Sequence, residues 1–127
     1  MKNLTREIKF RIWCNNEMRY DIQSLLFEDV YPTVSFTSRH GIHNSQEWET
    51  SDDCVLMQFT GLKDKNGVDI YEGDVVCLIV ERAIEKVVYH QDRFRVTNVN
   101  GWHDRLWEYC AFEGIEVIGN IFENPEL

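Results

Sequence analysis

Six consecutive apolar residues at positions 75–80, Val-Val-Cys-Leu-Ile-Val, restrict this chain to folds that can bury a strand on both faces. The run is rich in β-branched residues, and its length and composition are typical of a strand inside a sheet. Two glycine turns precede it closely, at Asn66-Gly67 and at Gly73, and such residues tolerate the positive φ of tight turns. The sequence therefore predicts a strand that enters the core directly from a turn.

Other short runs predict more strands with close turns between them. Residues 8–12 alternate apolar and cationic side chains, so Ile8, Phe10 and Ile12 share one face of a half-buried strand and the cations share the other. The remaining β-prone runs are residues 54–60, which Gly61 is expected to end, 86–90, 94–99 and 115–122. Together they predict one mainly β domain over residues 1–127, a sheet or small barrel with little helix.

Three stretches are harder to assign. Residues 15–29 approximate helical spacing but suit short strands equally well, and residues 106–112 could form one or two helical turns. Polar and charged residues dominate positions 37–53, which predicts a long loop or arm. We expect this loop to be the most variable part of the chain.

The charge balance bears on partners and compartment. Thirteen basic against 22 acidic residues give a net charge of −9, which repels phosphate backbones and anionic membranes. No apolar run is long enough to span a membrane, and the first ten residues lack the apolar stretch of a secretory signal. These features favour a cytoplasmic protein that binds no membrane and is an improbable general nucleic-acid binder.

The four cysteines are Cys14, Cys54, Cys77 and Cys110, with irregular spacing and no C-x-x-C pair. In a cytosolic domain this pattern favours reduced thiols that pack as small apolar residues, with metal ligation or oxidation as the alternatives. We predict no disulfide framework.

Three segments carry a resemblance to a known family. They are R-E-I-K-F-R-I-W at residues 6–13, L-M-Q-F-T-G-L-K-D-K-N-G-V-D-I-Y-E-G-D-V-V at residues 56–76 and I-E-V-I-G-N-I-F-E-N-P-E-L at residues 115–127. In that order they resemble the YopX-like family of bacteriophages and prophages. The resemblance implies an intracellular phage or prophage protein with several coiled β-sheets that include an SH3-like barrel. The family has no established activity, so no catalytic residue is transferred.

No motif in the chain supplies catalysis, a cofactor site or a metal site. The signatures G-x-S-x-G, H-E-x-x-H and the P-loop are absent. His40 and His43 could pair as ligands, but Gly41 lies between them in a polar loop, which argues against a rigid site. We therefore expect no enzyme activity, no cofactor and no bound metal.

The glycine-rich segment at residues 61–74 has two interpretations. It could be a recognition surface, but Gly61, Gly67 and Gly73 together with Asp64 and Asp74 fit turn chemistry better, with the carboxylates bonding turn amides. Tyr71 in this segment could serve as a core residue or as a binding anchor. It is a candidate binding residue on that ground.

Aromatic and cationic residues elsewhere are the other binding candidates. Tyr89, Arg93 and Arg95 lie in the chain's main basic and aromatic concentration, although alternation along strands would send neighbours to opposite faces. Trp48, in the acidic loop, and Trp102, after Asn100-Gly101, are candidate interface anchors.

The sequence thus favours a non-enzymatic protein-interaction module with an unidentified protein partner, and homo-oligomerisation is a further expectation because strand edges and loop aromatics need covering. One alternative is weak single-strand nucleic-acid binding by the barrel through Tyr89, Arg93, Phe94 and Arg95. The other is an acidic mimic of nucleic acid that occupies a host DNA-binding protein. Glu47, Glu49, Asp52 and Asp53 would carry that mimicry.

Overall fold

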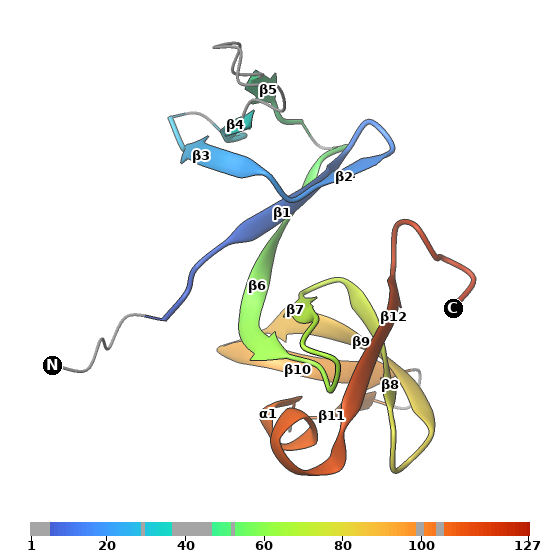
Figure 1. The fold of residues 1–127 in the computed structure, drawn as a ribbon. Helices are drawn as coiled ribbons and strands as arrows, with labels where there is room; N and C mark the ends of the chain where they lie inside the picture. Colours follow the sequence, from blue (N-terminus) through green and yellow to red (C-terminus); the bar gives the residue numbers. More distant parts are fainter. Residues whose placement is uncertain (1–5, 29, 37–46, 52, 99–100, 104–105) are drawn as a thin grey trace, which may run out of the picture. The chain divides into compact units, whose positions relative to one another are not determined.

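The protein is mostly β, with curled sheets that include a half-barrel (Figure 1). The computed structural model describes residues 6–28, 30–36, 47–51, 53–98, 101–103 and 106–127, and for residues 47–49, 101–103 and 112 it describes the backbone alone. The predicted fold class is confirmed. His40 and His43 lie outside the described residues.

The strands are β1 (Phe10–Cys14), β2 (Glu17–Arg19), β3 (Ile22–Leu26), β4 (Thr33–Phe36), β5 (Glu47–Glu49), β6 (Val55–Lys63), β7 (Asp69–Tyr71), β8 (Asp74–Leu78), β9 (Ala83–His90), β10 (Arg93–Asn98), β11 (Gly101–His103) and β12 (Ile115–Asn120). A three-residue α-helix, α1 (Leu106–Glu108), runs into a π-helix, η1 (Tyr109–Glu113). No helix in the described ranges is long and apolar enough to cross a membrane.

The strands form three sheets, ordered β2-β1-β6-β7, β11-β10-β9-β8-β12 and β3-β4-β5. Contacts divide the chain into two compact units. We call Phe10–Met57 the inserted unit and Met1–Lys9 with Gln58–Leu127 the half-barrel unit. This division describes contacts rather than independent folding, so the single domain stays a prediction.

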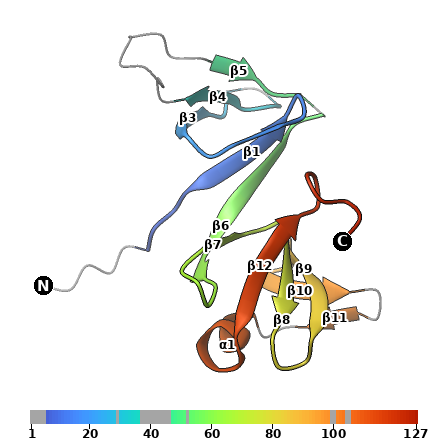
Figure 2. The same cartoon turned by 45° about the vertical axis from the view of Figure 1, so that its right-hand side comes forward.

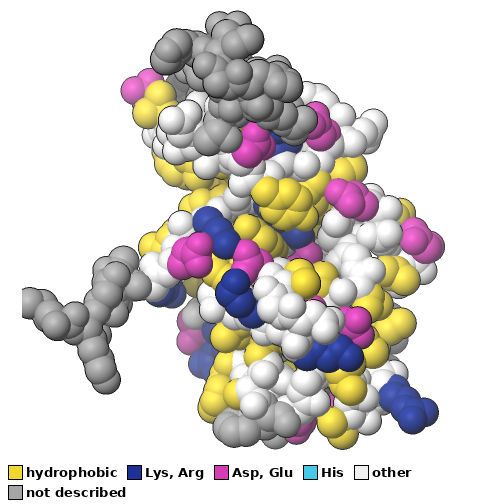
Figure 3. Space-filling view, viewed as in Figure 1, with side chains coloured by type: hydrophobic (Ala, Val, Ile, Leu, Met, Phe, Trp, Pro, Cys, Tyr) yellow, Lys and Arg dark blue, Asp and Glu magenta, His cyan; other side chains and the backbone are white. Residues whose placement is uncertain are grey.

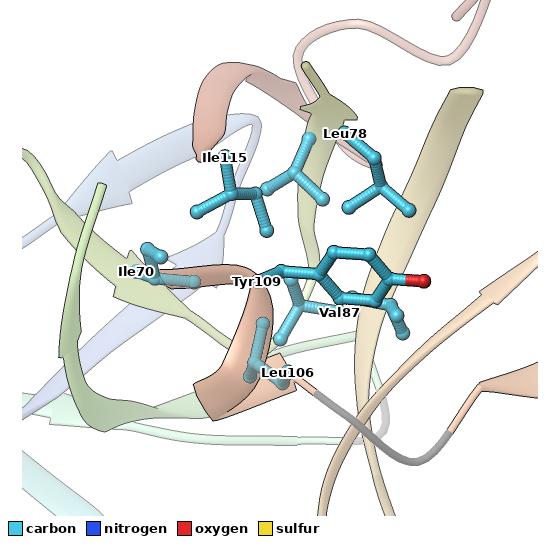
Figure 4. Packing of buried hydrophobic residues seen from close by; sticks show 8 residues of the cluster. Ile70, Leu78, Val87, Leu106, Tyr109 and Ile115 are labelled. Carbon is cyan, nitrogen blue, oxygen red and sulfur yellow. The ribbon is translucent and has the colours of Figure 1, made fainter. Parts of the chain in front are cut away.

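The half-barrel unit is built on an antiparallel sheet that curls around its own core (Figure 2). Alternation along β8, β9 and β10 turns Val76, Leu78, Val87 and Val96 inward, and all four are fully buried. The segment of α1 and η1 adds Leu106 and Tyr109, whose ring lies among the aliphatic side chains in Figure 4. The Tyr109 hydroxyl leaves the core and donates to Glu81 Oε1 at 3.1 Å.

Two expectations for the strands of this unit need correction. The apolar run at residues 75–80 is strand only to Leu78, and Val80 is exposed in the following turn. Gly61 does not end its strand, because β6 continues to Lys63 with a register shift against β7. Gly61 has φ of +85° and open space where a Cβ would be, so its left-handed backbone, not crowding, favours glycine there.

Asp64 organises the turn between β6 and β7. Its Oδ1 accepts the backbone N–H groups of Asn66 at 2.8 Å and Val68 at 2.9 Å, and its Oδ2 accepts that of Val117 in β12 at 3.0 Å. Gly67, at φ +81°, closes the turn by donating to the Asp64 carbonyl. The turn-chemistry interpretation of this segment therefore fits, and one buried carboxylate joins two of the sequence motifs.

The last residues fold back on β12 through asparagine hydrogen bonds. Asn120 Oδ1 accepts the N–H groups of Phe122 and Glu123, and Asn124 Oδ1 accepts that of Asn120. A Cβ on Gly119 would lie 2.5 Å from Asn124 Oδ1 and 2.9 Å from Leu127 Cδ1. A side chain at position 119 would therefore displace the side chains of Asn124 and Leu127 from these positions.

The inserted unit consists of short strands around a small core. Asn15 and Asn16, with φ of 56° and 59°, make the two-residue turn between β1 and β2. Within residues 15–28 the structure has the short strands β2 and β3 and no helix, and β5 lies inside the stretch expected to be loop. The sequence did not indicate β5, because a three-residue strand carries no sequence period of its own. The strand forms through its pairing with β4. Residues 37–46 of that stretch lie outside the described residues.

A disulfide between Cys14 and Cys54 closes the inserted unit. Cys14 ends β1 and Cys54 immediately precedes β6, so sheet pairing brings together two residues that are 40 positions apart. The expectation of four reduced cysteines was therefore wrong for this pair. Cys77 and Cys110 are free.

An ion pair with partial burial joins Lys9 to β7. Lys9 Nζ lies 2.6 Å from Asp69 Oδ2, and 4.5 Å from the centre of the Phe59 ring. The hydrogen bond to Asp69 is the main reason that the pKa of Lys9 is raised. Burial, the largest single effect on Asp69, opposes its ionisation, but the hydrogen bonds and charges of Lys9 and Lys63 outweigh it and lower the pKa of Asp69.

Asp69→Asn should therefore reduce stability in a pH-dependent way, by less than about 1 kcal/mol near neutral pH because such partly exposed pairs contribute little. The contribution of Asp69 is present above the ordinary carboxyl pKa of 3.8 and is lost as pH falls through the lowered folded value. That of Lys9 is present below 10.5 and is lost as pH rises through the raised folded value. Urea titrations of both proteins across pH measure the difference, and a difference independent of pH would contradict this account.

Candidate interaction surface

Large apolar side chains are exposed at the end of β3 and in the loop that follows. The exposed fractions are 50% for Leu26, 67% for Phe27, 89% for Val30 and 42% for Tyr31. Four such residues within six positions form a cluster, which we call the apolar loop (residues 26–31, of which position 29 is not described). Clustered exposure of this kind marks interaction sites more often than isolated exposed residues do.

Strand pairing explains why these side chains face outward. Leu25 pairs with the fully buried Val34 and packs against the core of the inserted unit, so its neighbour Leu26 takes the opposite face of the sheet. The far end of the loop is fixed because the Thr50 N–H and hydroxyl both donate to the Pro32 carbonyl, at 3.3 and 2.6 Å. The apolar loop is therefore held at both ends.

A cavity of about 250 Å³ adjoins the loop, within the inserted unit. It is lined by Ile12, Tyr31, Pro32, Thr50, Ser51, Cys54 and Leu56. Tyr31 thus belongs to both the cavity wall and the apolar loop. Cys54 places the disulfide beside the same cavity.

Cationic side chains of the inserted unit are turned away from solvent. Arg11 is 2% exposed and Arg19 4%, and they are its cationic residues among those that the structure describes. The burial of Arg11 corrects the expectation that the cations of residues 8–12 share a solvent face, and its Nη1 lies 3.4 Å from the Tyr20 hydroxyl. Arg19 lies over the Phe36 ring and binds Asp21 through two nitrogens, which raises its pKa.

The surface of this unit is consequently acidic. Residues 10–57 contain eight Asp or Glu and three Arg, which gives this unit a net charge of −5. On the visible face of the part that carries β3, β4 and β5, Figure 3 shows acidic and hydrophobic side chains with little Lys or Arg surface. Glu28, inside the apolar loop, and Asp53, near the cavity residue Cys54, are both exposed.

The predicted residues Tyr89, Arg93 and Arg95 lie together on the β9–β10 hairpin but on opposite faces. Tyr89 pairs with Phe94 on the core-facing side, edge to face at 5.0 Å, and is 54% exposed. Arg93 and Arg95 take the other side, where Asp92 Oδ1 lies 3.1 Å from Arg93 Nε and 3.7 Å from Arg95 Nη2. The hairpin therefore offers no joint aromatic and cationic surface, as strand alternation suggested.

The other predicted binding residues are placed as follows. Tyr71 is 5% exposed and packs against Phe59 at 5.6 Å, so it is a core residue and not an exposed anchor. Trp48 lies in β5, paired with Val34, and Trp102 lies in β11, paired with Thr97. The side chains of both tryptophans lie outside the described residues.

Phe27, Val30 and Tyr31 were not among the predicted binding residues. The available signal was the sequence L-L-F-E-D-V-Y-P at residues 25–32, in which apolar residues flank two carboxylates and precede a proline. Its spacing fits a helix and a strand equally well, so the sequence did not indicate which side chains are exposed.

Comparisons with known proteins agree on the fold. The family model described as YopX protein matches residues 9–127. The crystal structure of protein EF1440 from Enterococcus faecalis is similar, with a TM-score of 0.69 and 28% sequence identity over 96% of this chain and 98% of that chain. No curated protein matches the chain.

Proposed function

The chain belongs to the YopX protein family, and on this premise we propose that it is a phage or prophage protein that binds a protein partner in the bacterial cytoplasm and catalyses no reaction. The partner binds at the apolar loop. The observation that carries the proposal is the exposure of Phe27 and Val30 in a loop that is held at both ends. Aromatic and aliphatic side chains on a fixed support are suited to anchoring an interface.

Nucleic-acid binding by the half-barrel unit is less well supported. Stacking needs exposed rings beside a cationic groove, whereas Arg93 and Arg95 lie across the sheet from Tyr89 and beside Asp92. The acidic-mimic idea is a special case of protein binding. Of its four carboxylates, Asp53 is exposed, while Asp52 and the side chains of Glu47 and Glu49 lie outside the described residues.

Self-association remains a prediction. The apolar loop supplies an uncovered surface for it, but two copies of a unit with a net charge of −5 repel each other. These opposing effects favour a different protein as the partner. Light scattering at high protein concentration measures the oligomeric state directly.

Retention of a host protein should depend on the apolar loop. We expect the double substitution Phe27→Ser with Val30→Ser to reduce retention from nuclease-treated host lysate by about tenfold or more, because interface anchors each contribute on the order of 1–2 kcal/mol. The matched control is Tyr89→Ser with Val80→Ser, which removes one exposed aromatic and one exposed valine from the half-barrel unit. Quantitative mass spectrometry of the retained proteins compares the two.

Comparing the two variants shows whether the host protein binds at the apolar loop or at the half-barrel unit. Loss with the apolar-loop variant and retention with the control supports the proposal. Equal retention by both variants, or loss with the control alone, rejects the apolar loop as the binding surface.

A further inference from the structure

We propose that the cavity beside the apolar loop receives one apolar side chain from a partner segment that carries Lys or Arg on both sides of that residue. This inference rests on the proposed function and names the chemistry of its partner. It follows from the size of the cavity, the state of its polar groups and the charge around it.

The size of the cavity limits its occupant. Sites for whole small molecules usually enclose roughly 300–1,000 Å³, and this cavity encloses about 250 Å³. It is therefore better matched to a single side chain than to a cofactor or metabolite. An anchor residue in a pocket is the common arrangement at the centre of protein interfaces.

The walls of the cavity indicate an apolar occupant. Leu56, Cys54 and the fully buried Ile12 are among the lining residues, and Tyr31 and Pro32 complete the wall on the side of the apolar loop. Thr50 donates its hydroxyl to the Pro32 carbonyl, and Ser51 Oγ accepts the Asp53 N–H at 3.4 Å. Since these polar groups already have partners, binding would draw mainly on contact with the apolar walls.

The charge around the cavity indicates basic flanks. Asp53 is exposed next to the lining residue Cys54, and Glu28 is exposed in the apolar loop, which contributes Tyr31 to the cavity wall. Arg11 and Arg19 are buried and so do not cover the negative surface. The eight carboxylates and three arginines of the inserted unit add a long-range field of the same sign. A segment with Lys or Arg beside its anchor would be attracted, in a manner that salt screens.

Other occupants fit this combination less well. A second copy of the chain carries a net charge of −9, and nucleic acid is a polyanion, so both are repelled by the same field. Each appears as an outcome of the test below.

The test uses the full chain and fluorescent eight-residue peptides with a central Phe, Leu, Trp or Ser flanked by lysines, together with a central-Phe peptide flanked by glutamates. We expect at least one apolar-centred lysine peptide to bind about tenfold or more tightly than the serine peptide. The glutamate peptide should not bind. Raising salt from about 50 mM to about 500 mM should weaken binding about tenfold. Fluorescence anisotropy measures all of these.

Variants of the protein then locate the site. Tyr31→Ala, which removes an accessible wall, should weaken binding of the preferred peptide by about tenfold, while Tyr89→Ala should leave it unchanged. Glu28→Gln with Asp53→Asn should reduce the salt dependence and leave the preference for an apolar centre. Circular dichroism of each variant shows whether the fold is kept, and if Tyr31→Ala loses it, Ser51→Leu, which narrows the cavity from an exposed position, provides the same test.

The result that overturns this inference is equal binding of the apolar and serine peptides, binding of the glutamate peptide, or no peptide binding at up to about 1 mM. Concentration-dependent self-association that Tyr31→Ala abolishes would assign the cavity to a second copy, and competition by single-stranded nucleic acid would assign it to that ligand. Either outcome overturns the inference. Suppose that the variant Phe27→Ser with Val30→Ser fails to retain a host protein that the unmodified chain retains, while the apolar and serine peptides bind equally. In that case this inference fails and the proposed function stands.

Discussion

Reduction of the Cys14–Cys54 disulfide is expected to lower the free energy of unfolding of the inserted unit by about 4 kcal/mol, because the bond closes a long stretch of chain and limits the entropy of its unfolded state. The separation of the two cysteines is 40 residues. The unit depends strongly on this bond, since its fully enclosed core is small, with Ile12, Val34 and Phe36 beside Cys14. Hydrogen exchange of the β1 and β4 amides, with and without reductant, measures the loss. The amides of β8 and β9 serve as the internal control.

The state of the four thiols gives an independent check. Denatured protein should show two reactive thiols before reduction, from Cys77 and Cys110, and four afterwards. The count must be made in denaturant because burial, aided by the charge of Asp64, raises the pKa of Cys110 to about 11 and suppresses its native reactivity. Four thiols before reduction, or unchanged exchange after it, would contradict this prediction.

The disulfide illustrates what the sequence could not provide. Four irregularly spaced cysteines carry no information on pairing, and the pair forms only because β1 and β6 become neighbours in the sheet. The longer strands β8, β9, β10 and β12 of the half-barrel unit were predictable to within three residues at each end, because each contains β-branched residues in a short β-prone run. The three-residue strands β7 and β11 were not predicted. The short strands β2 to β5 were not, since their assignment depends on pairing across the inserted unit.

The candidate surface was predictable to a smaller extent. Strand alternation indicated that neighbouring aromatic and cationic residues would not share a face, but only the register of the β9–β10 hairpin, in which Tyr89 pairs with Phe94, places Tyr89 opposite to Arg93 and Arg95. The exposure of Phe27 and Val30 depends on the register of Leu25 with Val34 and on the hydrogen bonds of Thr50 to Pro32, and neither leaves a local pattern in the sequence. The burial of Arg11 likewise contradicts the alternation of its own strand.

The second large effect is expected from Asp64→Asn, because this carboxylate joins the β6–β7 turn to β12. It is 7% exposed and accepts three backbone N–H groups, from Asn66, Val68 and Val117. Hydrogen bonds to a charged group contribute about 1.5–3 kcal/mol each, and a buried N–H left without an acceptor costs about 1–3 kcal/mol. Asparagine removes the charge and turns a donating NH₂ group toward at least one of these N–H groups.

Asp64→Asn should therefore lower the free energy of unfolding by about 3 kcal/mol and release β12 from the turn. The matched control is Asp92→Asn, an exposed turn carboxylate that pairs with Arg93 and whose loss should have a far smaller effect. Urea titration measures stability, and hydrogen exchange at Val117 reports the bond to Asp64 Oδ2. Exchange at Val117 should rise further than exchange in β9, because the Val117 N–H donates directly to the carboxylate. Equal stability of the two variants would mean that the turn holds its shape through Gly67 and the backbone alone, and would remove Asp64 as the link between the two sequence motifs.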